Sequence, residues 1–187
     1  MRCLAWAPDL MQRGRTALRE QIDLQMLISE TRQQYMVLKV ALKDLNDRLN
    51  TVQGLSFGSD PHAATLFTRT HSHYQRSYGL CLVICILFNR ILKALDANHT
   101  GLDEESMRLC EDVLELSQQA AMYRPLGASY IALYLFAAWC GSTDEATRAR
   151  VEKSLIDYRT DFPAALGEGY KVELEHTSQR LSLLDDW

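Results

Sequence analysis

Two segments of the sequence concentrate side chains that could bind a ligand or move a proton. One is the His-Ser-His-Tyr run at residues 71–74, and the other is the Tyr-Arg pair at 123–124, which two further tyrosines follow. Histidine and tyrosine can donate and accept protons, and arginine binds carboxylates and phosphates. The candidate catalytic residues, if the chain is an enzyme, are His71, His73, Tyr74 and Arg124. The candidate ligand-binding residues are Tyr123, Arg124, Tyr130 and Tyr134.

Arg124 lies at the entrance of an apolar segment that we expect to be helical. A cation gains nothing from the dipole at the start of a helix, so this arginine needs another partner. An ion pair is favoured because buried charges in proteins are usually paired. The candidate carboxylates are Asp157, Asp161 and Glu115. The alternative is an anionic or carbonyl-bearing ligand.

Metal binding is not favoured by the histidines or the cysteines. His71 and His73 are two residues apart, and on a helix their side chains point about 200° away from each other. Cys81 and Cys85 share a helical face, but they lie in an apolar run with no histidine or carboxylate beside them, as is typical of buried thiols. We therefore expect no metal site and no cofactor.

The motifs of the best-defined enzyme classes are missing from the sequence. It contains no Cys-x-x-Cys pair, no His-Glu-x-x-His, no Gly-x-Ser-x-Gly, no glycine-rich phosphate loop and no acidic metal loop. An enzyme of this kind would be a cofactor-independent cyclase or isomerase. It would hold an apolar substrate in a shaped pocket and supply one or two proton donors.

Composition and charge narrow the possible partners. The 187 residues carry a formal net charge of -4, which gives no general attraction to DNA, and the local basic group of Arg13, Arg15 and Arg19 is followed at once by acidic residues. The five cysteines are odd in number and scattered, as is typical of reduced thiols. The first ten residues lack the apolar core of a signal peptide. We expect an intracellular protein of the cytoplasm or nucleus, with no direct DNA binding and no membrane insertion.

The elements that must position these residues are all helical, since no segment alternates with the period of a strand. We expect one all-α domain, residues 1–187, with about six helices: an N-terminal extension at 1–8, a long helix at 9–54 that is broken at most once, and a helical core at 62–187. Two central helices should be buried, because the runs at 78–88 and 130–139 are apolar on nearly every side. Both are shorter than the roughly 20 residues that cross a membrane.

Turn and cap residues suggest where the later helices begin and end. Pro125 is expected in the first turn of the helix that holds Tyr130, and Gly141 should end that helix in the left-handed conformation. Thr100 or Asp103 should cap the helix before it. The Ser-x-x-Glu pattern that starts at Ser142 predicts a capping box for the helix after it.

The long N-terminal helix carries an apolar stripe with alternating spacings of four and three. Its second half consists of Leu38, Leu42, Leu45, Leu49 and Val52. A second apolar set widens this face and favours packing onto the core over a coiled coil. That set is Leu27, Met36, Val37 and Val40. A homodimer or a protein partner bound through the 38–52 stripe stays open as the alternative.

The segment at 78–163 resembles the C-terminal part of the regulatory (middle homology) domain of fungal zinc-binuclear-cluster transcription factors. The resemblance is closest at 120–139, AAMYRPLGASYIALYLFAAW, followed by Asp157-Tyr158 and by Asp161-Phe162-Pro163. It implies an all-helical regulatory module that is linked to secondary metabolism or catabolism and sometimes senses a small metabolite. The closely spaced cysteines of the zinc cluster are absent, so a protein consisting of this chain alone would lack the family's own DNA-binding module.

Three hypotheses follow from the sequence. The first is a regulatory domain that senses a metabolite or binds a protein partner. The second is a cofactor-independent enzyme of natural-product biosynthesis that uses a helical pocket. The third is a structural domain whose polar side chains satisfy one another.

Overall fold

The computed structural model describes residues 2–20, 24–55, 61–96, 100–161 and 169–181. In these ranges the chain forms seven α-helices and two short 3₁₀ helices, and it forms no strand, which confirms the predicted all-α fold. The elements are α1 (Arg2–Glu20), α2 (Leu24–Gln53), α3 (Pro61–Leu95), α4 (Leu102–Ala120), η1 (Ala121–Tyr123), η2 (Leu126–Ala128), α5 (Ile131–Gly141), α6 (Glu145–Asp161) and α7 (Tyr170–Leu181).

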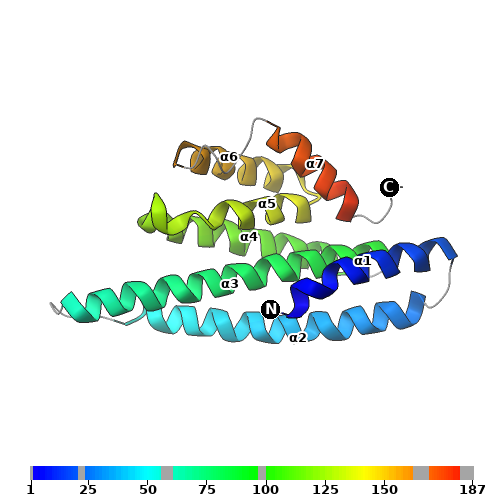
Figure 1. The fold of residues 1–187 in the computed structure, drawn as a ribbon, viewed down its shortest axis with the longest axis horizontal. Coiled ribbons are helices and arrows are strands. Elements are labelled where there is room, and N and C mark those ends of the chain that lie inside the picture. Colours follow the sequence, from blue (N-terminus) through cyan, green and yellow to red (C-terminus); the bar gives the residue numbers. More distant parts are fainter. Residues whose placement is uncertain (1, 21–23, 56–60, 97–99, 162–168, 182–187) are drawn as a thin grey trace.

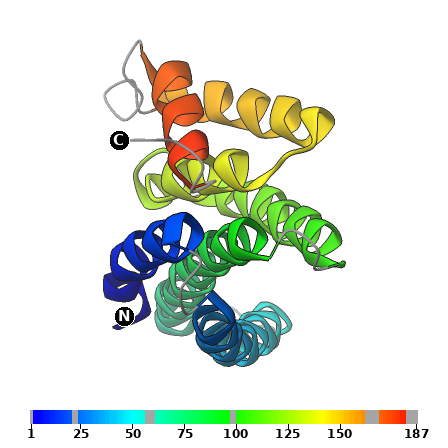
Figure 2. The same cartoon turned by 90° about the vertical axis from the view of Figure 1, so that its right-hand side faces the viewer.

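The helices form a layered bundle around α3 (Figures 1 and 2). α2 runs antiparallel along one side of α3, and α1 folds back over this pair. α4 and α5 cover the other side of α3, while α6 and α7 form the outermost layer above α5. The 35-residue α3 therefore has packed neighbours on both sides of its apolar half.

The two runs expected to be central are buried. Leu82, Phe88 and Ile91 of α3 are fully enclosed. On α5 nine of the eleven residues are buried, and Leu133 is the exposed exception. Because α5 contacts α3, α4, α6 and α7, its apolar side chains meet protein on nearly every side, as the sequence predicted.

The N-terminal prediction needs a correction. The extension expected at 1–8 belongs to α1 from Arg2 onward, and Pro8 lies inside that helix. An internal proline removes one backbone hydrogen bond. Burial of Leu10 and Ala17 against the rest of the bundle offsets that loss. The long helix expected at 9–54 is two helices, α1 and α2, and the residues that join them lie outside the described ranges.

The two apolar sets of α2 have different environments. The 38–52 stripe packs along α3, as favoured from the sequence, with Leu38 and Leu49 buried and the other three residues partly buried. The widening set does not pack onto the core as expected, except for Leu27. Met36, Val37 and Val40 are 58%, 61% and 70% exposed. The most exposed apolar side chains of α2 therefore lie outside the 38–52 stripe.

Two glycines allow α3 to approach its neighbours closely. A Cβ atom added at Gly79 would lie 2.1 Å from Cε2 of Tyr134, and one added at Gly141 would lie 2.4 Å from Cγ2 of Ile86. Gly141 is the last residue of α5 and was expected to be left-handed. Among the described glycines, only Gly101 has a positive φ, 102°, so Gly141 serves close packing instead.

Three helix starts differ from the sequence prediction. Gly101 precedes α4 without a side-chain cap, so neither Thr100 nor Asp103 caps that helix. For α6 the cap is Asp144, whose Oδ2 accepts hydrogen bonds from the backbone N and the hydroxyl of Thr147, both at 2.7 Å. α5 begins at Ile131, because residues 124–130 form turns and the short η2.

In the described part of the chain, α3 is long and apolar enough to cross a membrane by length and composition. In the structure, 72% of its apolar window is buried inside the bundle. Core helices of soluble proteins pass the same test, so this is weak support for a span.

Candidate functional site

The two segments singled out in the sequence meet at one hydrogen bond. Nδ1 of His71, on α3, lies 2.6 Å from the hydroxyl of Tyr123, the last residue of η1. The phenyl ring of Phe67 stacks on the His71 imidazole at 5.5 Å between centroids. These contacts leave His71 only 3% exposed. The pair therefore joins the polar half of α3 to the connection between α4 and α5.

Burial controls the protonation of this pair. It lowers the pKa of His71 and raises the pKa of Tyr123, so both groups are neutral near pH 7. Nε2 of His71 is buried and has no hydrogen-bond partner among the described residues. If Tyr123 donates to Nδ1, Nε2 carries the imidazole proton. If Nδ1–H donates instead, the Tyr123 hydroxyl keeps its own proton available for a ligand.

A surface groove of about 670 Å³ adjoins this pair on α3. Its lining residues are Thr65, Thr68, Arg69, Ser72, His73, Arg76, Tyr123 and Gly127. None of these named residues carries a negative charge, and two of them are arginines. The groove is an open, polar depression, whereas the sequence suggested a closed apolar pocket. Its chemistry suits an anion that bears several hydrogen-bond acceptors.

The cationic side of the groove is a helical stripe that sequence reasoning missed. Arg69, Ser72, His73 and Arg76 are spaced i, i+3, i+4 and i+7, which places them on one face of α3. Arg76 donates to the Ser72 hydroxyl at 3.0 Å. In the described part of the chain, Arg69 has no hydrogen bond or ion pair. The i, i+3, i+4, i+7 spacing is the sequence signal of this stripe.

Tyr130 and Tyr134 lie beneath the stripe and support it. The Tyr134 hydroxyl donates to the backbone carbonyl of Arg76 at 2.9 Å, and the Arg76 guanidinium lies 5.5 Å from the centre of the Tyr130 ring. The Tyr130 hydroxyl donates to Oε1 of Gln75 at 3.4 Å. Neither tyrosine is among the residues that line the groove. Tyr134 is buried, so its role here is to hold α3 against α5.

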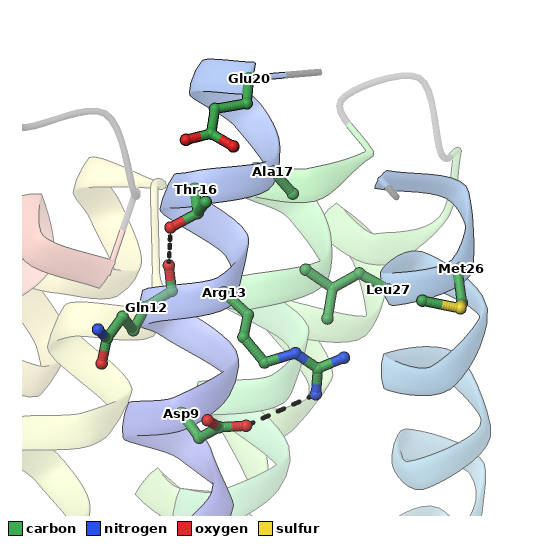
Figure 3. Close-up of a pocket in the computed structure, with 8 residues that line it drawn as sticks. All are labelled: Asp9, Gln12, Arg13, Thr16, Ala17, Glu20, Met26 and Leu27. Carbon is green, nitrogen blue, oxygen red and sulfur yellow. Dashed lines mark hydrogen bonds and ion pairs between the residues drawn. The ribbon is translucent and has the colours of Figure 1, made fainter. Parts of the chain in front are cut away.

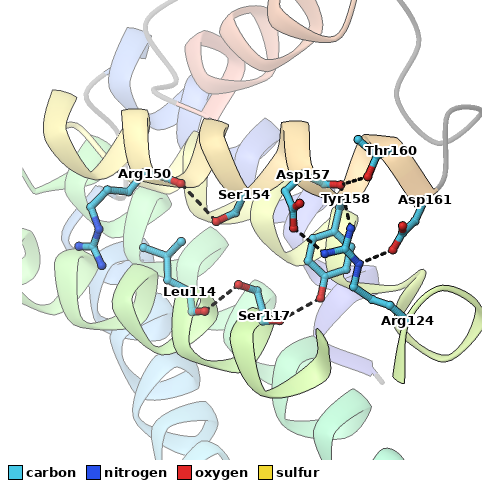
Figure 4. Close-up of polar contacts among 9 residues, drawn as sticks. All are labelled: Leu114, Ser117, Arg124, Arg150, Ser154, Asp157, Tyr158, Thr160 and Asp161. Carbon is cyan, nitrogen blue, oxygen red and sulfur yellow. Dashed lines mark hydrogen bonds and ion pairs between the residues drawn. The ribbon is translucent and has the colours of Figure 1, made fainter. Parts of the chain in front are cut away.

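Arg124 is engaged within the protein (Figure 4). Its guanidinium forms ion pairs with Asp157 and Asp161 of α6 and donates to the backbone carbonyl of Asp157 at 2.9 Å. It also lies 4.7 Å from the centre of the Tyr158 ring. Two of the three carboxylates expected from the sequence are thus its partners. These contacts occupy the donors that a ligand would need.

The remaining candidates divide between the groove and the core. His73 is exposed and lines the groove, with its ring 5.7 Å from that of Tyr74. Tyr74 is partly buried against the hydrophobic core and does not line the groove. The site that the structure assembles therefore contains His71, His73 and Tyr123 from the predicted set.

A second groove, between α1 and α2, has less to offer a ligand (Figure 3). Its volume is about 560 Å³, and Arg13 lies at its centre. The guanidinium of Arg13 is paired with Asp9 at 3.5 Å and with Glu30 at 2.7 Å. Because Arg13 is paired with two carboxylates, its guanidinium is not available to an anionic ligand.

The cysteines that are described are buried free thiols, at positions 81, 85, 110 and 140. Within the described ranges no three His, Cys, Asp or Glu side chains lie close enough to hold a metal ion. Searches of protein-family models, of curated proteins and of solved structures found no match to this chain. The chemistry of the groove is therefore the main guide to function.

Proposed function

We propose that this chain is a regulatory helical domain, similar to those of fungal zinc-cluster transcription factors, that senses an anionic metabolite of secondary metabolism. The ligand binds in the groove between α3 and η1. The support for this proposal is the resemblance at 120–139 together with the cationic lining of the groove. In this proposal the domain acts inside the cell, and DNA is bound by a module other than these helices.

The observation that carries the proposal is the convergence of Arg69, His73 and Arg76 without an acidic neighbour in the groove lining. The two arginines lie two helical turns apart on one face of α3, with the donor-bearing side chain of His73 between them. A carboxylate or phosphate could accept charge-assisted hydrogen bonds from the arginines. The Tyr123 hydroxyl, on the opposite wall, adds a polar contact from another element.

The position of the groove suits a regulatory role. A ligand between Arg76 and Tyr123 would tie α3 to the short η1–η2 connection, which Arg124 in turn fixes to α6. Ligand binding would therefore stabilise the contact between the two sides of the bundle. A ligand that binds only the folded state raises the melting temperature, and the rise grows with the logarithm of its concentration relative to its Kd.

The test is a melting-temperature screen with small di- and tricarboxylates and phosphate esters at low salt. We expect a saturable rise with at least one of them, and a tenfold or greater weakening of binding in Arg69→Gln, measured by calorimetry. Arg108→Gln is the matched control, because Arg108 is an exposed arginine on α4 outside the groove. Equal binding by both variants, or no rise with any of these anions, would contradict the proposal.

A second candidate function rests on the His71–Tyr123 hydrogen bond. A neutral imidazole that shares a proton with a phenol beside a groove could shuttle a proton in a cofactor-independent cyclisation or isomerisation. The test is to incubate the protein with cyclisable natural-product precursors and detect products by mass spectrometry. Turnover that is lost in both His71→Gln and Tyr123→Phe would favour the enzyme over the sensor. Absence of turnover in the unaltered protein would remove this candidate.

A further inference from the structure

A small pocket lies far along α3 from the groove, where α2 meets the end of α3 and the start of α4. Its volume is about 170 Å³. The lining residues are Arg32, Tyr35, Met36, Lys39, Leu92, Asp96, Leu102 and Glu105. Leu92 and Leu102 are buried, and they give the pocket an apolar wall.

Two ion pairs bridge the helices around this pocket. Arg32 of α2 pairs with Asp96, next to the end of α3, and Lys39 of α2 pairs with Glu105 of α4. Each cation at the pocket thus has its own carboxylate, so the pocket has no net charge. A charged ligand would have to compete with these pairs, whereas a neutral ligand would leave them intact.

The buried side of the pocket carries a polar group without a partner. Tyr35 lines the pocket and is 4% exposed, and its hydroxyl has no hydrogen bond to any described residue. Burial raises the pKa of Tyr35, and the charge of Glu105, which also lines the pocket, raises it further.

These features define the chemistry of an occupant. A buried donor without a partner is unfavourable, because it has lost its hydrogen bond to water. A ligand hydroxyl can satisfy it by accepting a hydrogen bond from Tyr35. The apolar wall requires an apolar body. A cavity of about 150 Å³ in another protein binds benzene, so a pocket of this volume holds one small ring.

We propose that this pocket is a binding site for a small neutral alcohol or phenol, whose hydroxyl oxygen accepts a hydrogen bond from the Tyr35 hydroxyl. The ring lies against Leu92 and Leu102, and Met36, which is largely exposed, covers the mouth. This site is independent of the proposed anion groove, because the two share no lining residue.

The experiment is a nuclear magnetic resonance titration of the full chain with phenol and with toluene, which has the same shape but no hydroxyl. Shifts of the Leu92 and Leu102 methyl signals report occupancy. We expect phenol to bind about tenfold more tightly than toluene, as one good hydrogen bond predicts. In Tyr35→Phe this preference should shrink severalfold.

A pair of surface variants keeps the test valid if Tyr35→Phe does not fold. Met36→Trp should block the mouth and abolish the methyl shifts. Val40→Trp, one turn along the same exposed face and outside the pocket lining, should leave them unchanged. The proposal would be overturned if phenol gave no saturable shifts, if phenol and toluene bound equally well, or if the two tryptophan variants had equal effects. A buried water would then be the occupant of the pocket.

Discussion

The lowered pKa of His71 makes the stability of this protein depend on pH in a defined direction. The unfolded chain has an ordinary histidine pKa of about 6.5, while burial holds the folded-state pKa below it. As the pH falls below about 6.5, the unfolded state therefore binds a proton that the folded state does not. The free energy of unfolding should then fall by up to about 1.4 kcal/mol per pH unit, until the pH reaches the folded-state pKa.

Urea unfolding at pH 7.5 and pH 5.5 measures this effect. The loss of stability on acidification should be smaller in His71→Gln than in the unaltered protein, because the variant has no imidazole to protonate. His73→Gln is the matched control, since His73 is exposed on the same helix, and it should keep the full loss. An identical acid response in His71→Gln would show that His71 does not titrate differently in the two states.

Arg124 and Arg150 provide a second comparison at the scale of single residues. Arg124 pairs with two carboxylates of α6, and Arg150 of α6 pairs with Glu111 of α4, but the side chain of Arg124 is 21% exposed and that of Arg150 is 54% exposed. Arg124→Gln should lower the free energy of unfolding by about 1–3 kcal/mol, because it breaks several partly buried charge-assisted hydrogen bonds. Arg150→Gln should cost less than about 1 kcal/mol, as exposed pairs do. Chemical denaturation of both variants checks the order, and similar losses would contradict it.

The residues of the site could be predicted only in part. The need of Arg124 for a carboxylate was predicted, and Asp157 and Asp161 were two of the three candidates, but the sequence did not distinguish them from Glu115 or from a ligand. The contact between His71 and Tyr123 crosses 52 residues of chain, so no local pattern could specify it. The same limit applies to Tyr35, because the burial of its unpaired hydroxyl depends on packing between helices that are far apart in the sequence.

At the scale of elements, the close approach of α3 to α5 can be tested through its glycines. Gly79→Ala would place a methyl group inside the ring of Tyr134 and 2.8 Å from Leu116, and neither side chain is free to move in the core. We expect a loss of about 1–3 kcal/mol or more in the free energy of unfolding. Gly169→Ala is the control, since nothing lies within 4 Å of its added Cβ. Thermal melts of both variants measure the difference, and a stable Gly79→Ala would mean that the helices can separate at little cost.

Helix periodicity predicted the positions of most helices correctly. The helix ends predicted from cap and turn residues were wrong in several cases. The apolar runs of α3 and α5 could belong only to buried helices, so their positions followed directly from the sequence. The extension predicted at 1–8, which contains Pro8, and the capping box predicted at Ser142 were wrong for the same reason. Burial of Leu10 and Ala17 outweighs the effect of an internal proline, and Asp144 bonds the first turn of α6 in place of Ser142. Tertiary contacts outweigh local propensity at these helix ends, and such contacts cannot be read from a single sequence.

At the scale of the whole molecule, the layered arrangement predicts an order of local stability. α5 is enclosed by four helices, whereas α7 lies in the outer layer and contributes one fully buried apolar side chain, Leu174. Native-state hydrogen exchange should therefore be slowest in α3 and α5, where amides open only on global unfolding. Exchange in α7 should be faster by at least tenfold. Equal protection in α5 and α7 would show that the outer layer unfolds with the core.

The central position of α3 also has a consequence for the newly made chain. α3 is complete long before α5 has been synthesised, yet α4 and α5 cover one of its sides. At translation rates of about 5–20 residues per second, that apolar side stays uncovered for several seconds after it leaves the ribosome. The period of greatest aggregation risk for this protein therefore falls during its synthesis, and it ends when α5 closes over α3.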